Sequence, residues 1–370
     1  MKVLYLLNFA GKAGTERYVE SLVKYLGPSG SGLVEPYFAY NTAGLLVERL
    51  EAMGVPTRQL AMNSRFDTKA AKTLAELCDE WDIDVIHCHY LRENYIALLA
   101  KRYNKKVRVV YTNHFVLAND FITRLSNKLL DKKQDRMIAV CNIGKEQLIA
   151  NGWSGEKIDV LHNGVDLDAW AGSRADSTLR AELGIPEDRF VMLCAARFAD
   201  DKGHDYLARS MKALQGITDI PFTLVLAGDG ELLEPTKALC QELGLGEDTV
   251  KFIGFRKDMK NLFKAADLYV NSSRHEALSF LIIEAMAAGL PAAITNMAGN
   301  PDILTGPEQG GLLLPYNDPE NTARLLARFL EEPDFLNLCR ENAGKNVAER
   351  FEIRKLARET YRVYEKAVEQ

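Results

Sequence analysis

The regular alternation of short apolar segments with amphipathic ones, along the whole chain, most constrains the fold. Many of the apolar segments lack a polar residue at every second position, as expected of strands that helices cover on both faces. We expect strands at residues 2–9, 34–40, 84–89, 107–114, 136–141 and 157–163, and again at 190–198, 222–228, 250–255, 268–273, 291–295 and 311–315. Helical patterns lie between them, at 15–26, 70–81 and 122–133 among others. This β–α rhythm predicts an α/β protein with parallel sheets.

The rhythm pauses once, in a polar stretch from Asp166 to Asp188 that has no strong strand pattern. A chain of 370 residues is long enough for two ordinary domains. We therefore expect two doubly wound, Rossmann-like domains, 1–168 and 169–352, that face each other across a cleft. The last helical pattern, Ile353–Val368, follows a break near 350–352, and we expect 353–370 to pack back on the first domain.

Composition narrows the class of protein. The formal net charge is -5, so the chain as a whole is not a nucleic-acid binder by charge. No apolar run reaches the roughly 18 residues of a membrane span, and the short apolar run at residues 2–9 is followed by a Gly-rich turn, which favours a buried strand over a signal peptide. The six cysteines are scattered without a CxxC pair, which predicts reduced, buried thiols and a cytoplasmic location.

Two carboxylates in the second half carry the strongest functional signal. Glu276 follows a polar loop, and Glu284 lies eight positions later within an apolar helical run. A helix that starts near Ser279 has free backbone N–H groups at its N-terminus, which suit a phosphate. Glutamates before and within such a helix frame an anionic ligand that also offers hydroxyls, as a sugar nucleotide does. The alternative for Glu284 is a pair with a Lys or Arg, although its neighbours are apolar and a buried carboxylate needs donors.

Several further motifs follow one another in a fixed order along the chain. They are GKAGTERYV, HCHY, YTNH, HNGVD, AARFADDKG, LAGDGEL, FIGFRKDMKNLFKAADLYVNSS, EALSFLIIE and AGNPDIL. With this ordered set, nearly the whole chain resembles the family 4 retaining glycosyltransferases, which have the GT-B fold. Two departures concern loop geometry: Ala277 stands where many members have glycine, and Ala298 precedes Gly299 where a pair of glycines is usual.

The resemblance implies a donor site in the second domain. Arg197 and Lys202 contact the donor diphosphate in that family, Glu284 holds the ribose, and Glu276 positions the donor sugar. The other donor-side positions that the resemblance indicates are Gly228, Arg256, Ala277, Leu278 and Ser279. For Arg197 and Lys202 the alternative is an ion pair with Asp200, Asp201 or Asp205. For Glu276 a nucleophilic role is conceivable, although the family's usual account lets the leaving diphosphate help to deprotonate the acceptor.

The resemblance also implies roles in the first domain. The backbone N–H groups of Gly14 and Thr15 approach the diphosphate, and His114 stabilises positive charge on the sugar ring. His89 is a weaker candidate on the acceptor side. The alternatives are a plain strand-to-helix turn at Gly14 and a strand-end histidine at position 114.

No metal or other cofactor is expected beside the nucleotide-sugar co-substrate. Asp82-Ile83-Asp84 has the form of a metal-binding DxD, but it leads into an apolar segment and indicates the start of a strand. His87 and His89 share a strand face and could be metal ligands, yet the sequence shows no second cluster of ligands that would complete a metal site. A phosphorylase, a nucleotide-sugar sensor and an inactive partner subunit remain alternative functions.

The sequence says least about the acceptor substrate. Residues 121–136 combine a basic side with Phe121, Ile122, Leu125, Leu129 and Leu130. This combination is compatible with an anionic lipid surface or a lipid-linked acceptor. The alternative is an ordinary core-facing helix with a solvated basic side. We expect a glycan or lipid-linked acceptor in polysaccharide or glycolipid assembly, no nucleic acid, and a cytoplasmic protein with possible peripheral contact at the inner face of a membrane. The sequence leaves the sugar and the base open.

Overall fold

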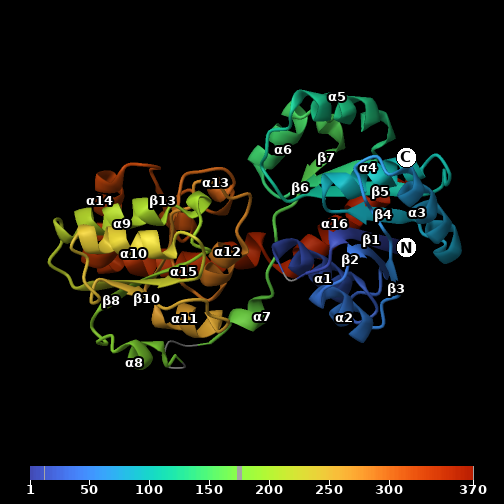
Figure 1. The fold of residues 1–370 in the computed structure, drawn as a ribbon. Coiled ribbons are helices and arrows are strands. Elements are labelled where there is room, and N and C mark those ends of the chain that lie inside the picture. Colours follow the sequence, from blue (N-terminus) through green and yellow to red (C-terminus); the bar gives the residue numbers. More distant parts are fainter. Residues whose placement is uncertain (12, 173–176, 370) are drawn as a thin grey trace. The chain divides into compact units, whose positions relative to one another are not determined.

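The computed structural model describes residues 1–11, 13–172 and 177–369 (Figure 1). The chain forms two compact units. Met1–Gly164 and Ile353–Gln370 make up the first, and Val165–Glu352 the second. The polar stretch that begins at Asp166 therefore belongs to the second unit, and its residues 173–176 lie outside the described residues.

The first unit contains a seven-stranded sheet in the order β3-β2-β1-β4-β5-β6-β7, and all its paired strands are parallel. The strands are β1 (Lys2–Phe9), β2 (Glu35–Thr42), β3 (Thr57–Gln59), β4 (Val85–Cys88), β5 (Arg108–Asn113), β6 (Arg136–Ala139) and β7 (Ile158–Val160). The chain leaves β1 toward β2 on one side and returns to β4 on the other. Such a reversal of strand order opens a crevice at the carboxyl ends of the strands, where ligands bind in doubly wound sheets.

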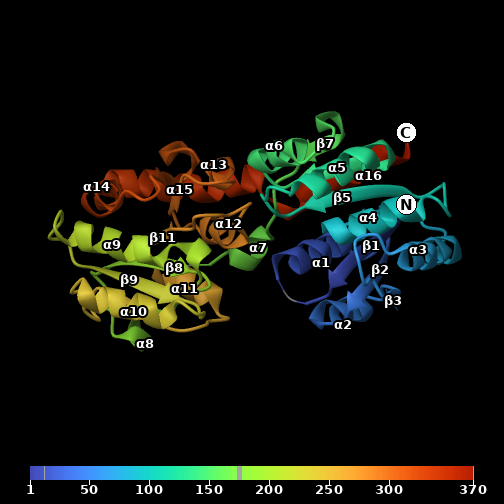
Figure 2. The same ribbon diagram turned by 45° about the horizontal axis from the view of Figure 1, so that its top comes forward.

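Helices flank this sheet on both sides (Figures 1 and 2). They are α1 (Gly14–Leu26), α2 (Leu45–Ala52), α3 (Thr68–Trp81), α4 (Leu91–Ala100), α5 (Phe121–Leu130), α6 (Asn142–Ala150) and α16 (Ile353–Val368). The last of these, α16, packs on α1 and on strands β4 to β6, and Figure 2 shows it in red beside β5. Its amphipathic face supplies Tyr364, which is fully buried.

The second unit contains a six-stranded parallel sheet in the order β10-β9-β8-β11-β12-β13. Its strands are β8 (Phe190–Ala195), β9 (Phe222–Ala227), β10 (Val250–Phe252), β11 (Leu268–Asn271), β12 (Ala292–Thr295) and β13 (Gly311–Leu314). The helices are α7 (Leu167–Trp170), α8 (Leu179–Leu183), α9 (His204–Gln215), α10 (Leu233–Glu242), α11 (Met259–Ala265), α12 (Phe280–Ala287), α13 (Asn300–Ile303), α14 (Pro319–Glu331) and α15 (Pro333–Arg350). Here the strand order reverses between β8 and β11.

An aspartate just before a strand stabilises the amino edge of each sheet. Asp84 accepts the backbone N–H of Lys2 at 2.8 Å, Asp135 that of Val109 at 2.7 Å, and Asp267 that of Val191 at 2.9 Å. In each case the side chain reaches the neighbouring parallel strand and satisfies a donor at the sheet's edge. Asp267 is 6% exposed and also pairs with the buried Arg180 at 2.8 Å.

The fold class predicted from the β–α rhythm is confirmed: both units are doubly wound parallel sheets. All twelve predicted strands form, although most end one to three residues earlier than expected. β3 was missed because its sequence, TRQ, is polar and the strand lies at the edge of the sheet. All six cysteines are buried and free, as predicted. In the described part of the chain no helix has the length and apolarity needed to cross a bilayer.

We predict that Asp267→Asn lowers the free energy of unfolding by about 3 kcal/mol, the scale on which a buried ion pair responds to the loss of one partner. Asparagine keeps the volume and an acceptor for the Val191 N–H, but it leaves the charge of Arg180 buried. The matched control is Asp84→Asn at an exposed position, for which we expect about 1 kcal/mol or less. Urea titrations measure both values, and equal losses would contradict the prediction.

Candidate functional site

The strand-order reversal of the second unit brings two predicted residues together. Lys202 follows β8, and Glu276 follows the adjacent strand β11. The Lys202 Nζ donates to Glu276 Oε1 at 2.7 Å and lies 3.2 Å from Asp201 Oδ2. The two side chains are 17% and 19% exposed, so the pair is partly shielded from solvent but open to a ligand. The sequence did not show that these two residues, 74 positions apart, are direct partners.

The backbone holds the same two loops together. Ser272 Oγ donates to the Lys202 carbonyl at 2.8 Å, and the Arg274 N–H donates to the Asp201 carbonyl at 2.8 Å. Gly203 has φ +64°, and a Cβ there would lie 2.3 Å from the Ser272 carbonyl oxygen, so only glycine allows this approach. The position of the Lys202–Glu276 pair is therefore fixed by main-chain contacts on both sides.

Charges around Lys202 favour its protonated form. Burial by itself lowers the pKa of Lys202, but the carboxylates of Glu276 and Asp201 outweigh it and raise the pKa above its ordinary value. Arg197 differs, because its side chain is 71% exposed and its guanidinium lies 3.7 Å from Asp201. The ion pairs with Asp201 that sequence reasoning gave as the alternative thus exist. The diphosphate role of Arg197 and Lys202 stays a prediction.

Lys202 does not open a helix itself. It ends a 3₁₀ turn, Asp200–Lys202, and α9 begins two residues later at His204. The backbone of Lys202 therefore lies just before the N-terminus of α9, and the helix dipole disfavours a cation close to that end. The two carboxylate partners offset this effect.

The helix that follows Glu276 begins where the sequence predicts. Ser279 is the N-cap of α12, with extended backbone and no capping bond from its side chain. Leu278 is buried, while Ala277 and Ser279 are partly exposed. Glu284 is the fifth residue of α12 and is 1% exposed. The structure thus places a buried carboxylate one turn inside a helix whose first N–H groups face the loop after β11.

A strained turn at Ala298 and Gly299 holds the backbone of Glu276 in place. Ala298 has φ +46°, one of three positive values among the described non-glycine residues, and the next N–H, of Gly299, donates to the Glu276 carbonyl at 2.9 Å. Backbone strain of this kind persists where surrounding contacts enforce it. The alanine at position 298 is visible in the sequence as a departure from the usual glycine, but its contact with Glu276 appears only in the structure.

Gly228 and Arg256 are both engaged in contacts within the second unit. Gly228 has φ +148° and its N–H donates to the Gly254 carbonyl at 2.8 Å, while a Cβ would lie 1.9 Å from the Ala196 oxygen. Arg256 pairs with Glu182 at 2.5 Å and with Asp258 at 2.6 Å. The close approach to Ala196 explains the glycine at position 228, the ion pairs hold the Arg256 side chain, and the donor-binding roles of both residues stay predictions.

The first unit gathers its predicted histidines in one cluster, in which His89 is buried and His114 is partly exposed. His89 Nδ1 and His114 Nε2 are 3.1 Å apart, and the rings stack with centroids 5.4 Å apart. Tyr18 of α1 packs edge-on against both rings. Burial lowers the pKa of His114 to about 3 and that of His89 well below its ordinary value. Both imidazoles are therefore neutral at physiological pH.

His87 shares this strand face but has other partners. Its ring nitrogens contact Tyr364 Oη and Thr112 Oγ1, each at 2.7 Å, and its ring centroid lies 4.3 Å from that of His89. Within the described residues no group of three or more His, Cys, Asp and Glu side chains has an arrangement that could hold a metal ion.

Gly14 and Thr15 open α1, whose first N–H groups lie just after β1. Gly14 is exposed and Thr15 is buried. Two buried glutamates near this strand end were not singled out by the sequence analysis. Glu16 Oε1 accepts the Gly11 N–H at 3.2 Å, and Glu93 Oε1 accepts the Asn8 N–H at 2.5 Å. Both carboxyl groups lie beside the loop after β1, and a glutamate shortly after a strand was the signal available in the sequence.

The basic and apolar segment at 121–136 has an exposed face. Phe121, Ile122 and Leu129 are 79%, 75% and 72% exposed, and Leu125 is 50% exposed. The core-facing alternative is therefore wrong for these side chains. Asn127 and Thr123, on the opposite side of α5, are the buried ones.

Models of protein families match both halves of the chain. The model for glycosyl transferases group 1 matches residues 176–346, and that for glycosyltransferase family 4 matches residues 13–169. A curated relative, the UDP-Gal:alpha-D-GlcNAc-diphosphoundecaprenol alpha-1,3-galactosyltransferase of Escherichia coli, is 29% identical over 319 residues, which cover 83% of this chain and 82% of that protein.

Other relatives agree with this pattern. The N-acetylgalactosamine-N,N'-diacetylbacillosaminyl-diphospho-undecaprenol 4-alpha-N-acetylgalactosaminyltransferase of Campylobacter jejuni is 27% identical over 77% of each chain. Among solved structures, a glycosyltransferase from Rickettsia africae has a TM-score of 0.86 at 20% identity and covers 100% of this chain and 99% of its own. Anabaena HepE, solved with UDP, has a TM-score of 0.84 at 21% identity over 97% and 98% of the chains.

We predict that Glu93→Gln gains stability relative to the wild type as pH rises. Burial raises the pKa of Glu93 to about 7. Between pH 4.5 and 7 the unfolded chain releases a proton that the native state holds, so the stabilisation is present below pH 4.5 and is lost as pH rises through 7. Glutamine has no such dependence.

From pH 5 to pH 8 the variant should gain about 2 kcal/mol over the wild type, at about 1.4 kcal/mol per pKa unit. Urea midpoints at the two pH values measure this. Exposed Glu242→Gln is the control, for which the difference should not change. A parallel pH dependence of wild type and Glu93→Gln would refute the pKa assignment.

Proposed function

Because this chain belongs to the group 1 glycosyltransferases of family 4, we propose that it moves a sugar from a nucleotide-diphosphate sugar to an acceptor hydroxyl, with retention of the anomeric configuration. Membership in the family confirms the resemblance predicted from the motifs. The two Rossmann-like units are those of the GT-B fold. The chain is therefore a glycosyltransferase, and the donor, the stereochemistry and the residue roles are the proposal.

The Lys202–Glu276 pair is the observation that supports this proposal most. It lies at the strand-order reversal of the second unit, beside the exposed guanidinium of Arg197 and the N-terminus of α12. Two cations and a set of backbone N–H groups at this edge suit a diphosphate. In the proposed complex Lys202 binds the diphosphate instead of Glu276. The Glu276 carboxylate can then accept hydrogen bonds from the hydroxyls of the donor sugar.

The negative charge of the leaving diphosphate has to be stabilised as the bond to the sugar breaks. Arg197, Lys202 and helix N-termini supply this stabilisation in our proposal, without a metal ion. The buried carboxylate of Glu284 accepts the two ribose hydroxyls. Retention follows if the departing diphosphate helps to deprotonate the acceptor on the same face of the sugar.

His114 is proposed to act near the reacting carbon as a neutral group. Because its pKa is about 3, the imidazole carries no charge that would oppose positive charge on the sugar ring. The N–H groups of Gly14 and Thr15 are proposed to approach the diphosphate from the start of α1, and His89 to border the acceptor. Gly228 and Arg256 are proposed to contact the nucleotide, mainly through the backbone of their loops.

The acceptor is proposed to be a glycan on a lipid carrier, as in the printed names of the Escherichia coli and Campylobacter jejuni relatives. The exposed apolar side chains of α5, together with Arg124, Lys128, Lys132 and Lys133, suit an anionic membrane surface. We therefore propose a peripheral protein of the cytoplasmic face in polysaccharide or glycolipid assembly. A UDP-sugar donor is favoured by the UDP bound to HepE.

We predict that Arg197→Ala and Lys202→Ala each lower turnover about a hundredfold or more, the scale of losing one preorganised charge stabiliser. The reaction to follow is release of nucleoside diphosphate from the donor. Arg209→Ala, on the exposed side of α9, is the matched control and should leave turnover unchanged. Unchanged turnover in both test variants would remove the diphosphate assignment.

We predict that Glu284→Gln weakens nucleoside-diphosphate binding at least about tenfold, because hydrogen bonds to a charged group contribute about 1.5–3 kcal/mol. A thermal-shift screen with UDP, GDP and ADP first identifies the nucleotide, since a bound ligand raises the melting temperature by mass action. Calorimetric titration then gives the two dissociation constants. An unaffected constant would argue against the ribose role.

A nucleotide-sugar sensor is the second candidate, and slow donor hydrolysis separates the two. An enzyme hydrolyses its donor in the absence of an acceptor, whereas a sensor binds the donor tightly and neither hydrolyses nor transfers it. The intact set of Arg197, Lys202, Glu276 and Glu284 favours the enzyme.

A further inference from the structure

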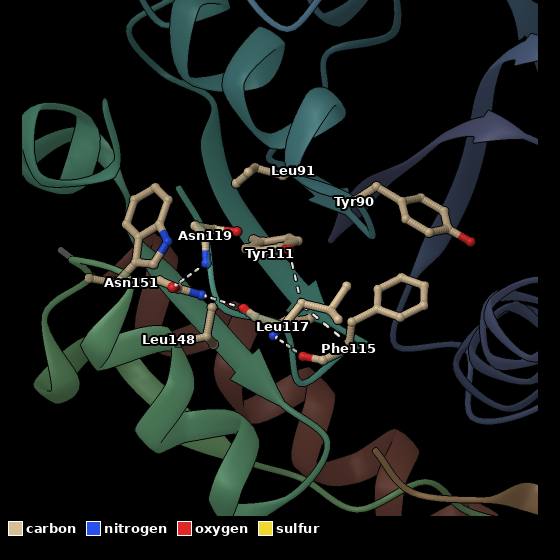
Figure 3. A pocket seen from close by; sticks show the side chains of 10 residues that line it. Tyr90, Leu91, Tyr111, Phe115, Leu117, Asn119, Leu148 and Asn151 are labelled. Carbon is tan, nitrogen blue, oxygen red and sulfur yellow. Dashed lines mark hydrogen bonds between the residues drawn. The ribbon is translucent and has the colours of Figure 1, made fainter. Parts of the chain in front are cut away.

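A small pocket in the first unit lies outside the residues discussed so far (Figure 3). It has a volume of about 190 Å³ and opens at the carboxyl ends of β4 and β5. Its walls come from the segments after these strands and from α6 with the turn that follows it. Most of the lining side chains are apolar or aromatic, among them Tyr90, Leu91, Phe115, Leu148 and Trp153.

Trp153 is held in this wall by the C-terminus of α6. Gly152 has φ +100°, and the Trp153 N–H donates to the Leu148 carbonyl at 3.2 Å, so the chain turns sharply after the helix. The carbonyl of the preceding Asn151 accepts the Asn127 amide at 2.7 Å. The indole is therefore fixed by backbone contacts at its base and is 3% exposed.

The indole N–H is the unusual group of the pocket. Trp153 Nε1 is buried and has no hydrogen-bond partner among the described residues. A buried donor without an acceptor is costly, and a tryptophan N–H in a protein interior normally finds a partner. A ligand that enters this pocket and carries an acceptor oxygen beside an apolar group would satisfy it.

The other polar side chains of the pocket are arranged by local contacts. Asn151 Nδ2 donates to the Leu117 carbonyl at 2.8 Å, and its Oδ1 accepts the Asn119 N–H at 2.9 Å. Asn113 Nδ2 donates to the Phe115 carbonyl at 2.7 Å. These bonds, drawn as dashed lines in Figure 3, hold the two asparagine side chains in place beside the apolar residues of the pocket.

Two aromatic rings lie side by side at one end of the pocket. Tyr90 and Phe115 have ring centroids 5.8 Å apart, and Figure 3 shows both rings on the same side of the labelled group. Tyr90 directly follows His89, the predicted acceptor-side histidine. The two rings are inclined at 33° to each other, and such a pair offers a partly apolar surface to the C–H face of a sugar ring.

We infer that this pocket holds the acetamido group of an N-acetylated sugar in the acceptor. The acetamido carbonyl accepts the Trp153 N–H, the methyl group packs against Leu148 and Leu91, and the sugar ring lies on Tyr90 and Phe115. The volume agrees, because a cavity of about 150 Å³ holds benzene, and 190 Å³ holds an acetamido group with the ring carbon that bears it. A hydroxyl in its place leaves most of the pocket empty.

This assignment rests on the proposed function, since it names the acceptor of the same reaction. It also gives a physical basis for the choice of acceptor sugar, which the donor site does not determine. Discrimination arises here from a single unpaired donor in an apolar wall, and an analogue that lacks the carbonyl leaves that donor unpaired.

Fluorescence of Trp153 tests the inference directly. The chain has three tryptophans, so Trp81→Phe with Trp170→Phe leaves Trp153 as the sole indole. This full-length protein is titrated with N-acetylglucosamine, glucose and glucosamine. We expect a change in emission with N-acetylglucosamine and an affinity for the other two at least about tenfold weaker, equivalent to 1.4 kcal/mol.

Two variants in the otherwise unchanged chain give an independent readout. Trp153→Phe keeps an aromatic ring and removes the N–H, and Leu148→Phe adds volume to the pocket. Both should abolish the thermal shift that N-acetylglucosamine produces, whereas Trp81→Phe should retain it. Melting curves without sugar establish that each variant folds, and donor hydrolysis should persist in both because it needs no acceptor.

The outcomes separate this inference from the proposed function. Equal responses to the three sugars, no response to any, or an undiminished shift in Leu148→Phe overturns the acetamido assignment. A response to a short isoprenoid alcohol but not to N-acetylglucosamine also overturns it, in favour of a hydrocarbon site. If donor hydrolysis persists in such a case, the proposed function stands; if the acetamido sugar binds but no nucleotide sugar does, the proposed function fails and the pocket remains.

Discussion

The ion pair between Lys202 and Glu276 is the contact on which the rest of the second unit's site depends. It joins the loops after two adjacent parallel strands, at the one place where the strand order of that sheet reverses. Main-chain bonds between the same loops, together with a glycine that alone permits their approach, set its geometry before any ligand arrives. An anion that binds there competes with Glu276 for a lysine whose pKa is already raised, so it meets a cation that stays charged.

The same sheet geometry explains why the two edges of each sheet differ in chemistry. At the amino edge, aspartates such as Asp135 and Asp267 satisfy the N–H groups of neighbouring strands and pair with Lys101 or Arg180. These carboxylates accept hydrogen bonds from groups within the same unit. At the carboxyl edge, by contrast, polar groups are left with capacity for a ligand, among them the imidazole cluster of the first unit. Parallel strands make this division inevitable, because all their carboxyl ends lie on one side.

The sequence predicted the fold well because apolar segments covered on both faces have a clear signature, and every predicted strand is present. Where strands were predicted too long, as at residues 196–198 and 272–273, the extra residues belong to the loops that carry Arg197 and lead to Glu276. The motifs proposed individual candidate residues, but they did not indicate the partners of these residues. No pattern in the sequence links Lys202 to Glu276, or His89 to His114, because these contacts depend on which strands become neighbours.

Trp153 illustrates the remaining gap between sequence and site. It belongs to none of the ordered motifs, and in the sequence an isolated tryptophan after a helix looks like an ordinary core residue. Only the structure places it in the wall of a pocket with its N–H unpaired among the described residues. The ordered motifs contain the candidate residues Lys202, Glu276 and Glu284, but not Trp153. The pocket around Trp153 is therefore recognised only from an unpaired donor and the space beside it, and both depend on how the chain folds.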